Sequence, residues 1–537
     1  MNSILEDSNQ IKIIEYDKNC VVIAKPGSGK TFVLCEKIKR LVPKLKKYQA
    51  VIAISYTNKA SKELQSRCIR RGIDTKKVFF GTIDRFCINE IIIPFGKQIF
   101  GLPLTKEMEI KRLSEISDSQ VKMSYNETED FNEQHISFCK DKFISGQIVL
   151  DFIGPLANYL FDKSIACRRY LKSRYTHLMI DEYQDSGYYQ HNLFISLKKI
   201  GLIAIAVGDS NQSIFAFSNK SSKYLISLSE NPEFKLFPLD FNHRSHPSIM
   251  NYATCLLQEF SPSHNEEINV FYKLVNGSEI ELAKWLNLAI PFFAKKYNVS
   301  NMSKIGILTK SNRSGKLISK NLNIKNRYFI PTPLDEEASR WSNIFIKVLT
   351  CLLDKTDTSY ELLEELIDID YDRTKKIILF NLINRLKKLN IEKSNIDIEK
   401  VTDLFCSIAE VVAPSLSNIY AIDKLKQVLS TKEFLYSFGT PYKDEVQIMS
   451  LHKSKGSEFE LIFHLDLYEY ILPNNINGDF VQDLNLHYVG ITRASKACIL
   501  CTSTARHKAC DQKITNAKPS QFLNRNNLIG LRLNSPI

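Results

Sequence analysis

The segment AKPGSGKT, residues 24–31, combines residue types that can bind a chain of phosphates. It follows the apolar run CVVI and precedes the helical sequence VLCEKIKRL, which is the strand–loop–helix setting of a phosphate-binding loop. Gly27 and Gly29 let backbone N–H groups approach phosphate oxygens, and the start of the following helix favours negative charge. Lys30 would neutralise the β- and γ-phosphates, and the Thr31 hydroxyl would coordinate Mg²⁺.

Two adjacent carboxylates end a second apolar run, THLMIDEYQDS. At a strand end beside the phosphate loop, Asp181 would hold the metal and Glu182 would activate the attacking water. The alternative is an ordinary pair of solvated acidic residues at a strand end. A further acidic strand end downstream, VGDSNQ, favours the catalytic interpretation.

Phosphoryl transfer also needs positive charge on the transferred phosphate. Arg244 in FNHRSH and Arg493 in YVGITRAS are the candidates. Arg493 lies far along the chain, so its use would place the nucleotide between two domains. Hydrolysis would then move these domains relative to each other.

Two sets of short apolar strands would position these side chains. The first contains CVVIA, AVIAIS, THLMI and LIAIAVG, and the second contains IGILT, VQIMS, LIFHL and KACILCTS. Apolar strands that alternate with helices indicate parallel sheets covered on both faces, and two sets indicate two α/β domains. We expect the first domain at 1–88 and 148–245, the second at 246–346 and 441–537, and mainly helical insertions, including TKEMEIKRLSEISDS, at 89–147 and 347–440.

The net charge of +13 points to a polyanionic partner, most simply nucleic acid. The start MNSILEDSNQ lacks the pattern of a signal peptide, and no apolar run reaches the ~20 residues of a membrane span. Cysteines scattered through apolar stretches indicate reduced thiols and a cytoplasmic protein. We interpret the lysine-rich face of the second insertion as a solvated helix surface, with DNA binding as the alternative.

Cys498, Cys501, His507 and Cys510 have a spacing that loosely resembles a metal site. The sequence KACILCTST alternates like a strand, so a core strand followed by a basic tail is the better interpretation.

The ordered set of motifs resembles the UvrD/Rep/PcrA-type superfamily 1A DNA helicases. The motifs, in the order in which that family has them, are Gln10, AKPGSGKT, SYTNKAS, GTIDRF, DEYQDS, VGDSNQSIFAF, NHRS, ILTKSN, VQIMSLHKSKGSEF and YVGITRAS. The resemblance implies two RecA-like parallel-sheet domains in tandem, an ATP and Mg²⁺ site, and single-stranded or tailed duplex DNA as the partner.

The resemblance also implies roles for individual residues. Gln10 would read the adenine edge, Gln212 would sense the γ-phosphate, and Glu458 would contact the ribose. Arg244 and Arg493 would be arginine fingers. The residues expected to contact ATP are Gln10, Ala24, Lys25, Pro26, Gly27, Ser28, Gly29, Lys30, Thr31, Phe32, His243 and Glu458.

Single-stranded DNA would follow a track lined by Tyr56, Thr82, Phe215, Phe217 and His452. Aromatic platforms stack on bases without reading their sequence. Core packing is the alternative for the two phenylalanines, and it would be favoured without the resemblance.

Four departures from the family pattern bear on these contacts. His243 stands where the family has a tyrosine that stacks on adenine, so base selectivity is expected to be looser. Phe32 replaces an arginine after the phosphate loop, which also bears on nucleotide contacts. Ile83 and Asp84 replace an aromatic residue and a histidine, which weakens one DNA contact. Ser218 also replaces an arginine.

The motif series predicts an ATP-driven motor that separates DNA strands while moving 3′ to 5′. The alternative is a regulatory module whose ATP cycle reports DNA ends or single strands to a nuclease, and an RNA helicase is a third reading. The compact chain also resembles the helicase subunit of the Gabija anti-phage defence systems, which acts beside an OLD-type nuclease subunit. We therefore expect a role in defence or repair, with such a nuclease as partner.

Overall fold

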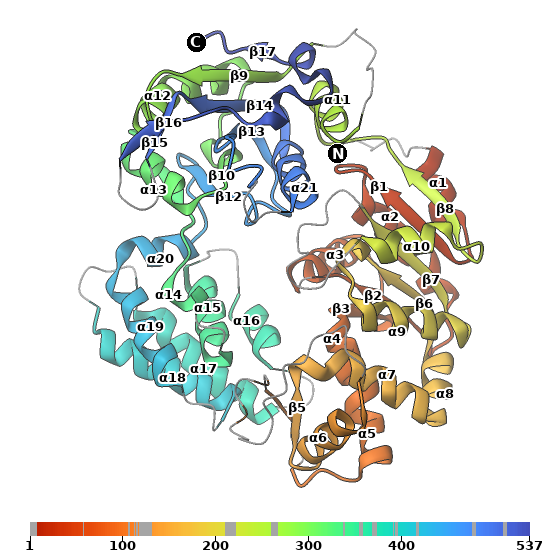
Figure 1. Cartoon of the computed structure of the whole chain (residues 1–537). Coiled ribbons are helices and arrows are strands. Elements are labelled where there is room, and N and C mark those ends of the chain that lie inside the picture. Colours follow the sequence, from red (N-terminus) through yellow and green to blue (C-terminus); the bar gives the residue numbers. More distant parts are fainter. Residues whose placement is uncertain are drawn as a thin grey trace. The chain divides into compact units, whose positions relative to one another are not determined.

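The computed structural model divides the chain into two compact units, Met1–Ser245 and His246–Ile537 (Figure 1). Each unit contains a parallel sheet and a helical insertion. The structure describes residues 8–56, 58–105, 108–111, 113, 116, 131–209, 222–258, 267–336, 339–353, 358–367, 373–389, 391, 396–414, 418–474, 479–507 and 513–537.

The sheet of the first unit is parallel throughout and has the strand order β3-β2-β6-β7-β1-β8. Buried apolar clusters cover both faces, which explains the near-continuous apolar strands. The strand register brings Ile54, Gly81 and Ile180 level, so their chains leave the sheet at one edge. The strands are β1 (Cys20–Ala24), β2 (Ala50–Ile54), β3 (Val78–Gly81), β6 (Tyr175–Ile180), β7 (Ile203–Gly208) and β8 (Lys235–Leu239).

Helices connect these strands and form an insertion between β3 and β6. The connecting helices are α1 (Ser8–Glu15), α2 (Lys30–Leu41), α3 (Asn58–Arg70), α9 (Tyr188–Lys199) and α10 (Lys223–Glu230). The chain between β3 and β6 forms α4 (Ile83–Phe86), a π-helix (Cys87–Ile92), α5 (Ile93–Phe100), α6 (Glu133–Ile144), α7 (Ile153–Lys163) and α8 (Ile165–Arg174). Its apolar residues join the core cluster on one face of the sheet.

One segment of this insertion is a strand where the sequence predicted helix. Within TKEMEIKRL, β4 (Glu109–Lys111) pairs in parallel with β5 (Gln147–Val149), and Ile110 lies opposite Ile148. Ile148 is buried, so this pairing anchors the strand to the core. Backbone pairing with a buried neighbour therefore outweighs the helical propensity of a polar segment. Most of the remaining predicted run lies outside the described residues.

The sheet of the second unit is also parallel, with the order β11-β12-β10-β13-β14-β9-β17. These strands are β9 (Val270–Val275), β10 (Ile305–Thr309), β11 (Asn326–Tyr328), β12 (Val446–Ser450), β13 (Phe459–His464), β14 (Ala494–Ser503) and β17 (Leu533–Asn534). Helices α11 (Pro247–Leu257), α12 (Glu279–Lys296), α13 (Asn312–Asn321) and α21 (Phe480–Ile491) accompany them, with an antiparallel pair β15 (Ala505–His507) and β16 (Ile514–Asn516).

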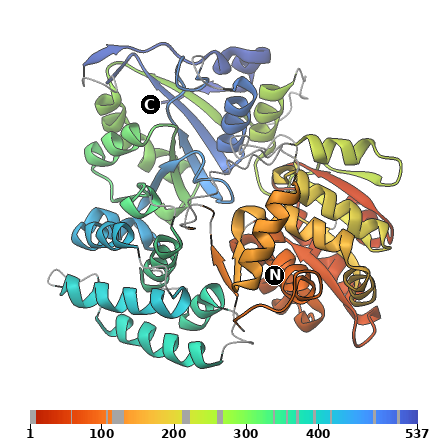
Figure 2. The ribbon, with the colours of Figure 1, turned by 60° about the horizontal axis from the view of Figure 1, so that its bottom comes forward.

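The insertion of the second unit is helical in its described residues, as the sequence predicts. It has a buried apolar cluster of its own, and Figure 2 shows its helices grouped as a bundle, in green to blue. The helices are α14 (Pro333–Glu336), α15 (Arg340–Leu353), α16 (Ser359–Leu366), α17 (Arg373–Leu389), α18 (Ile398–Val412), α19 (Ile419–Ser430) and α20 (Lys432–Phe438).

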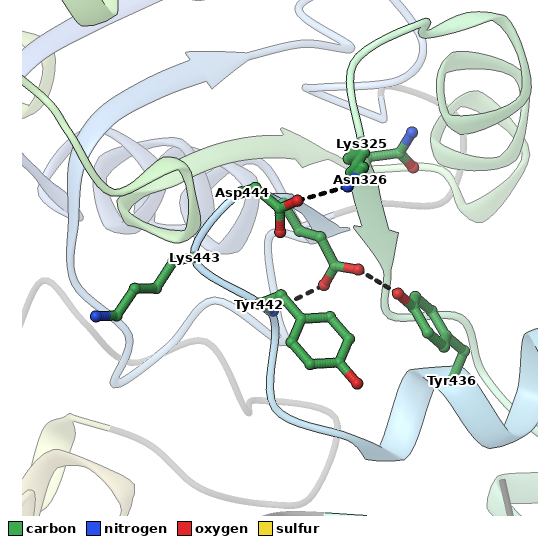
Figure 3. Close-up of a pocket in the computed structure, with 7 residues that line it drawn as sticks. Lys325, Asn326, Tyr436, Tyr442, Lys443 and Asp444 are labelled. Atoms are coloured by element: carbon green, nitrogen blue, oxygen red, sulfur yellow. Dashed lines mark hydrogen bonds and ion pairs between the residues drawn. The ribbon is translucent and has the colours of Figure 1, made fainter.

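A network of charged and aromatic groups joins α20 to the edge of the second sheet. Arg327 is buried, its Nε donates to Glu445 Oε2 at 3.0 Å, and its guanidinium lies 3.7 Å from the centre of the Tyr436 ring. Beside this network a pocket of about 690 Å³ is bordered by Lys325 and Asp444, whose side chains pair at 2.7 Å (Figure 3). The charged groups in these pairs bind each other, so the network fastens the bundle to the sheet.

The cysteine-rich segment is a core strand. Cys498 and Cys501 are buried in β14, and three residues of spacing put them on opposite faces of the sheet. His507 Nδ1 contacts Glu279 Oε2 at 2.8 Å, while Cys510 lies outside the described residues. The core-strand interpretation is therefore confirmed. Within the described part of the chain, no helix is both long and apolar enough to span a bilayer.

Candidate nucleotide and DNA site

The phosphate loop connects β1 to α2 and requires glycine at two positions. Gly27 and Gly29 have φ angles of +71° and +86°, which side chains rarely adopt. A Cβ atom at position 27 would lie 2.6 Å from Asn242 Nδ2 and 2.7 Å from Arg244 Cβ, and one at position 29 would lie 2.7 Å from Gln10 Nε2. The loop is therefore packed directly against two of the chain's other motifs, Gln10 and NHRS.

Asn242 fastens the segment NHRS to this loop, a role that the sequence analysis missed. Its Nδ2 donates to the Pro26 carbonyl, and its Oδ1 accepts from the backbone N–H groups of Arg244 and Ser245 at 2.8 and 2.6 Å. The His243 N–H donates to the Gly27 carbonyl at 2.9 Å. Arg244 is thereby held at the phosphate loop, where an arginine finger is expected. The sequence signal that could have revealed this role of Asn242 was its place in the NHRS motif.

Gln10, on α1, also contacts the loop. Its side chain is buried, and Nε2 donates to the Ser28 carbonyl at 3.0 Å and lies 3.1 Å from His243 Nε2. Lys37, a buried residue of α2, donates to the carbonyls of Ile13 and Tyr16 at the end of α1. An ammonium at a helix C-terminus is stabilising, so Lys37 ties the helix that carries Gln10 to the helix that follows the loop.

The loop lysine faces the predicted carboxylates. Lys30 Nζ lies 3.2 Å from Glu182 Oε1, and both side chains are mostly buried. Burial acts to lower the pKa of Lys30, but the carboxylates of Glu182, Asp181 and Asp209 outweigh it, so the pKa is raised. A fully charged lysine among three acidic groups at the ends of β6 and β7 is suited to receive a polyphosphate.

Asp181 and Glu182 occupy a tight turn after β6. Glu182 has a φ of +55°, and its N–H donates to Asp181 Oδ1 at 2.9 Å. Burial, together with the charge of Glu182, raises the pKa of Asp181 to about 7. A buried carboxylate with a raised pKa and the Thr31 hydroxyl at the start of α2 are hard oxygen donors. This donor set fits Mg²⁺.

Phe32 and His243 differ from the family pattern at positions expected near the nucleotide. One has a cationic neighbour and the other an aromatic neighbour. The Arg71 guanidinium lies 4.9 Å from the centre of the Phe32 ring, and the His243 and Phe241 ring centres are 4.7 Å apart. Arg71 reaches Phe32 from the turn after α3, and its guanidinium also pairs with Glu36. The remaining residues expected at the nucleotide, Ala24 and Lys25, flank the loop at the end of β1, where the Lys25 N–H donates to the Leu239 carbonyl.

The two carboxylates predicted to be catalytic, Asp181 and Glu182, share a pocket of about 160 Å³ with two residues expected on the DNA track. Tyr56 follows β2, and Thr82 follows β3 and caps α4 by accepting from the Arg85 N–H at 3.3 Å. Asp84, which replaces the family's histidine, lines the same pocket. The register of β2, β3 and β6 explains why these separate motifs end together.

The second unit contains the other expected site residues. Arg493 is buried there, where its Nε donates to the Val489 carbonyl at 3.1 Å. Glu458 is exposed and His452 is partly buried, and burial together with Lys310 lowers the pKa of His452. Three predicted residues, Gln212, Phe215 and Phe217, lie outside the described residues, as does Ser218.

Two family models match this chain. Residues 9–218 match an AAA domain, and residues 347–505 match the UvrD-like helicase C-terminal domain. The chain belongs to the UvrD-like helicases. Residues 9–218 include the phosphate loop and the DEYQDS turn.

Relatives of this UvrD-like helicase extend over nearly its whole length. The Gabija protein GajB of Bacillus cereus strain VD045 is 28% identical over 511 residues, covering 92% of this chain and 95% of GajB. The DNA helicase Rep of Escherichia coli K12 is 24% identical over 622 residues, covering 94% and 91%. The DNA helicase PcrA of Staphylococcus epidermidis RP62A is 20% identical over 605 residues, covering 90% and 81%.

These matches confirm the resemblance to UvrD/Rep/PcrA-type superfamily 1A helicases and the α/β class with tandem parallel sheets. This UvrD-like helicase is accordingly an ATP-hydrolysing DNA helicase. The assignments of individual site residues and subdomain boundaries stay predictions.

Proposed function

We propose that this helicase translocates on single-stranded DNA in the 3′ to 5′ direction and separates the strands of a tailed duplex. The observation that carries the proposal is the pocket shared by Asp181, Glu182, Tyr56 and Thr82. Groups that hydrolyse ATP and groups expected to touch DNA line one small cavity at a single sheet edge. A DNA strand that shifts Tyr56 or Thr82 would therefore change the surroundings of the catalytic carboxylates.

Within this proposal the residues of the first unit divide the work of hydrolysis. Lys30 binds the β- and γ-phosphates, and Glu182 accepts the proton of the attacking water. Thr31 and Asp181 would hold Mg²⁺, which neutralises phosphate charge when bound. Gln10 orients the adenine. The raised pKa of Lys30 keeps the ammonium charged for this task.

The remaining roles in ATP hydrolysis and DNA binding are assigned to residues from both halves of the chain. Arg244 and Arg493 stabilise charge on the transferred phosphate, Gln212 senses the γ-phosphate, and Glu458 contacts the ribose. Asn242 supports the role of Arg244, because it holds the backbone of that residue against the phosphate loop. Phe215, Phe217 and His452 complete the DNA track.

We further propose that the protein acts in anti-phage defence, in the cytoplasm, beside an OLD-type nuclease subunit. The near full-length match to GajB supports this proposal, since its name places it in a Gabija system. The cysteines that the structure describes are free thiols, as expected in a reducing compartment. A role in DNA repair is the alternative setting, supported by the matches to Rep and PcrA.

A second candidate function is a DNA-responsive ATPase that regulates the nuclease without robust unwinding of its own. Asp84 favours it, because its carboxylate lines the pocket beside Thr82. A negative group at this position opposes contact with a DNA phosphate, whereas the family's histidine can donate to one. Weaker binding of the DNA strand would leave ATP hydrolysis unchanged and reduce processive unwinding.

ATP turnover with and without single-stranded DNA, and strand displacement on duplexes with 3′ or 5′ tails, test the proposal. We expect DNA to stimulate turnover and only the 3′-tailed duplex to be unwound, with Lys30→Ala inactive in both assays. Turnover indifferent to DNA would contradict the motor function. Stimulated turnover without displacement would favour the regulatory candidate, and an Asp84→His variant should then gain unwinding.

A further inference from the structure

Gln184 is a fully buried side chain that contacts the proposed catalytic base. It lies in the short helix Tyr183–Asp185 after β6 and is 0% exposed. Its Nε2 donates to Glu182 Oε2, and its Oε1 accepts from the Asp209 N–H at 3.0 Å. Because a backbone N–H can only donate, Asp209 fixes which end of the amide is oxygen and turns the NH₂ group toward Glu182.

We propose that Gln184 is a positioning residue, which keeps the Glu182 carboxylate in place when Lys30 turns to the phosphates of ATP. The inference rests on the proposed role of Glu182 as the base. Lys30 pairs with Oε1 of this carboxylate, whereas Gln184 binds Oε2. Phosphate oxygens compete for the ammonium of Lys30, but they do not compete for a neutral amide anchored at the end of β7.

The Gln184 amide packs closely against Gly208 at the end of β7, where Leu225 also lies near. A Cβ atom at Gly208 would lie 2.6 Å from Gln184 Oε1 and 3.3 Å from the Gln184 backbone nitrogen. The register of β6 and β7 pairs Ile180 with Ala206, so the two strand ends that Gln184 connects lie side by side. Gly208 therefore reflects the space that the Gln184 amide needs.

The backbone around Glu182 defines the rest of the geometry. Its left-handed conformation is supported by Asp181 Oδ1, which accepts the Glu182 N–H, and by the Asp185 N–H, which donates to the Glu182 carbonyl at 3.0 Å. These bonds fix the Cα atom but leave the side-chain torsions open. Gln184 acts on the carboxylate itself, two residues along the chain.

Misplacing a catalytic group by about 1 Å can cost ~10²-fold in rate. Loss of the Gln184 amide should therefore lower kcat for ATP and leave KM nearly unchanged, because the phosphate loop and Gln10 still bind the nucleotide. A purely structural role would instead lower the melting temperature and reduce apparent kcat only in proportion to the folded fraction, so kcat per nucleotide-binding molecule would stay at the wild-type value.

Two substitutions separate these roles. Gln184→Met keeps the length of the side chain and removes both hydrogen bonds. Gln184→Glu keeps an acceptor for the Asp209 N–H but places a second carboxyl beside Glu182, so the two carboxyls must share a proton or repel each other. We expect both to lower kcat roughly 10- to 100-fold with KM within about threefold. Wild-type kcat in Gln184→Met would overturn the proposal, because methionine has no donor for the Glu182 carboxylate.

Asn158→Leu is the matched control, since it removes another interior amide of the same unit. Asn158 Nδ2 donates to the carbonyls of Gly154 and Tyr189, both at 2.9 Å. This control should lower the melting temperature without changing kcat. If Gln184→Met reduced kcat no more than Asn158→Leu does, the positioning role would be wrong.

A double variant shows whether Gln184 acts through Glu182. In a Glu182→Gln background, adding Gln184→Met should leave the residual turnover unchanged, because no carboxylate remains to be positioned. A further loss equal to that of Gln184→Met alone would overturn the inference. Wild-type turnover by Glu182→Gln alone would contradict the proposed base, whereas its inactivity beside a fully active Gln184→Met would overturn this inference only.

Discussion

Lys30 Nζ and Glu182 Oε1 lie 3.2 Å apart, so the phosphate-binding lysine is paired with the proposed base. An incoming γ-phosphate must compete with this carboxylate for the ammonium. If ATP binding draws Lys30 to the γ-phosphate as proposed, one oxygen of Glu182 is freed for a water. In that case arrival of the nucleotide would free the proposed base, and this base would activate the attacking water.

Replacing Glu182 by glutamine should preserve ATP binding and remove turnover. The amide cannot accept the proton of the attacking water, while Asp181 and Thr31 keep their oxygen donors. We expect a loss of at least ~10²-fold in kcat, with unchanged or tighter binding of a fluorescent ATP analogue. Near-normal turnover would show that another group serves as the base.

Gly27→Ala should weaken ATP binding at least ~10-fold, which is about 1.4 kcal/mol. The new Cβ would meet Asn242 and Arg244, so the loop and the NHRS segment would have to separate. Gly72→Ala is the control, because Gly72 has a similar φ of +72° but no heavy atom within 4 Å of its Cβ position. Both variants carry backbone strain, and equal binding defects would refute the packing argument.

Arg493→Ala should lower kcat by at least ~10³-fold if this residue stabilises charge in the transition state. In the structure its guanidinium donates to the Val489 carbonyl and to Thr492 Oγ1, within its own unit. Arg493→Lys tests the bidentate geometry, because lysine supplies charge without the planar fork. Full ATPase activity in Arg493→Ala would mean that hydrolysis does not use this residue. If activity is lost, a melting curve of the variant shows whether unfolding is the cause.

The second unit should lose stability in mild acid because of two buried imidazoles. His464 Nε2 lies 3.0 Å from His487 Nδ1; burial lowers the pKa of His464 to about 4 and that of His487 as well. The folded-state pKa of each imidazole is lower than the unfolded-state pKa of about 6.5. As pH falls from about 6.5 toward about 4, protons therefore bind the unfolded state preferentially, and the fold loses stability.

For His464 alone, the free energy of unfolding should decrease by roughly 2 kcal/mol between pH 7.5 and pH 5. Denaturant unfolding of wild type and of a His464→Leu/His487→Leu variant at both pH values measures the effect. The variant should be less stable at pH 7.5 but show a smaller decrease on acidification. An unchanged decrease would place the acid sensitivity elsewhere.

Strands buried on both faces could be predicted from sequence, while edge strands could not. AVIAI and ACILC are almost continuously apolar, and both form interior strands as expected. The strand β8, with the sequence KLFPL, lies at the sheet edge, contains a proline, and is largely solvent-exposed, so it has no comparable pattern.

The same contrast applies to the site. The phosphate loop and the DEYQDS turn are local motifs whose chemistry depends on adjacent residues. Asn242 and Pro26 are 216 positions apart, and only the fold brings them together. Gln184 was visible within DEYQDS, but its role depends on Asp209, at the end of a different strand.

The segment NHRS is attached to the phosphate loop directly before the first unit ends. Asn242 holds the Arg244 and Ser245 backbone, and the second unit begins at the next residue, His246. The chain therefore passes from the first unit to the second directly after a segment that is hydrogen-bonded to the phosphate loop. We expect a flexible spacer inserted after Ser245 to leave ATP hydrolysis intact and to uncouple it from movement along DNA.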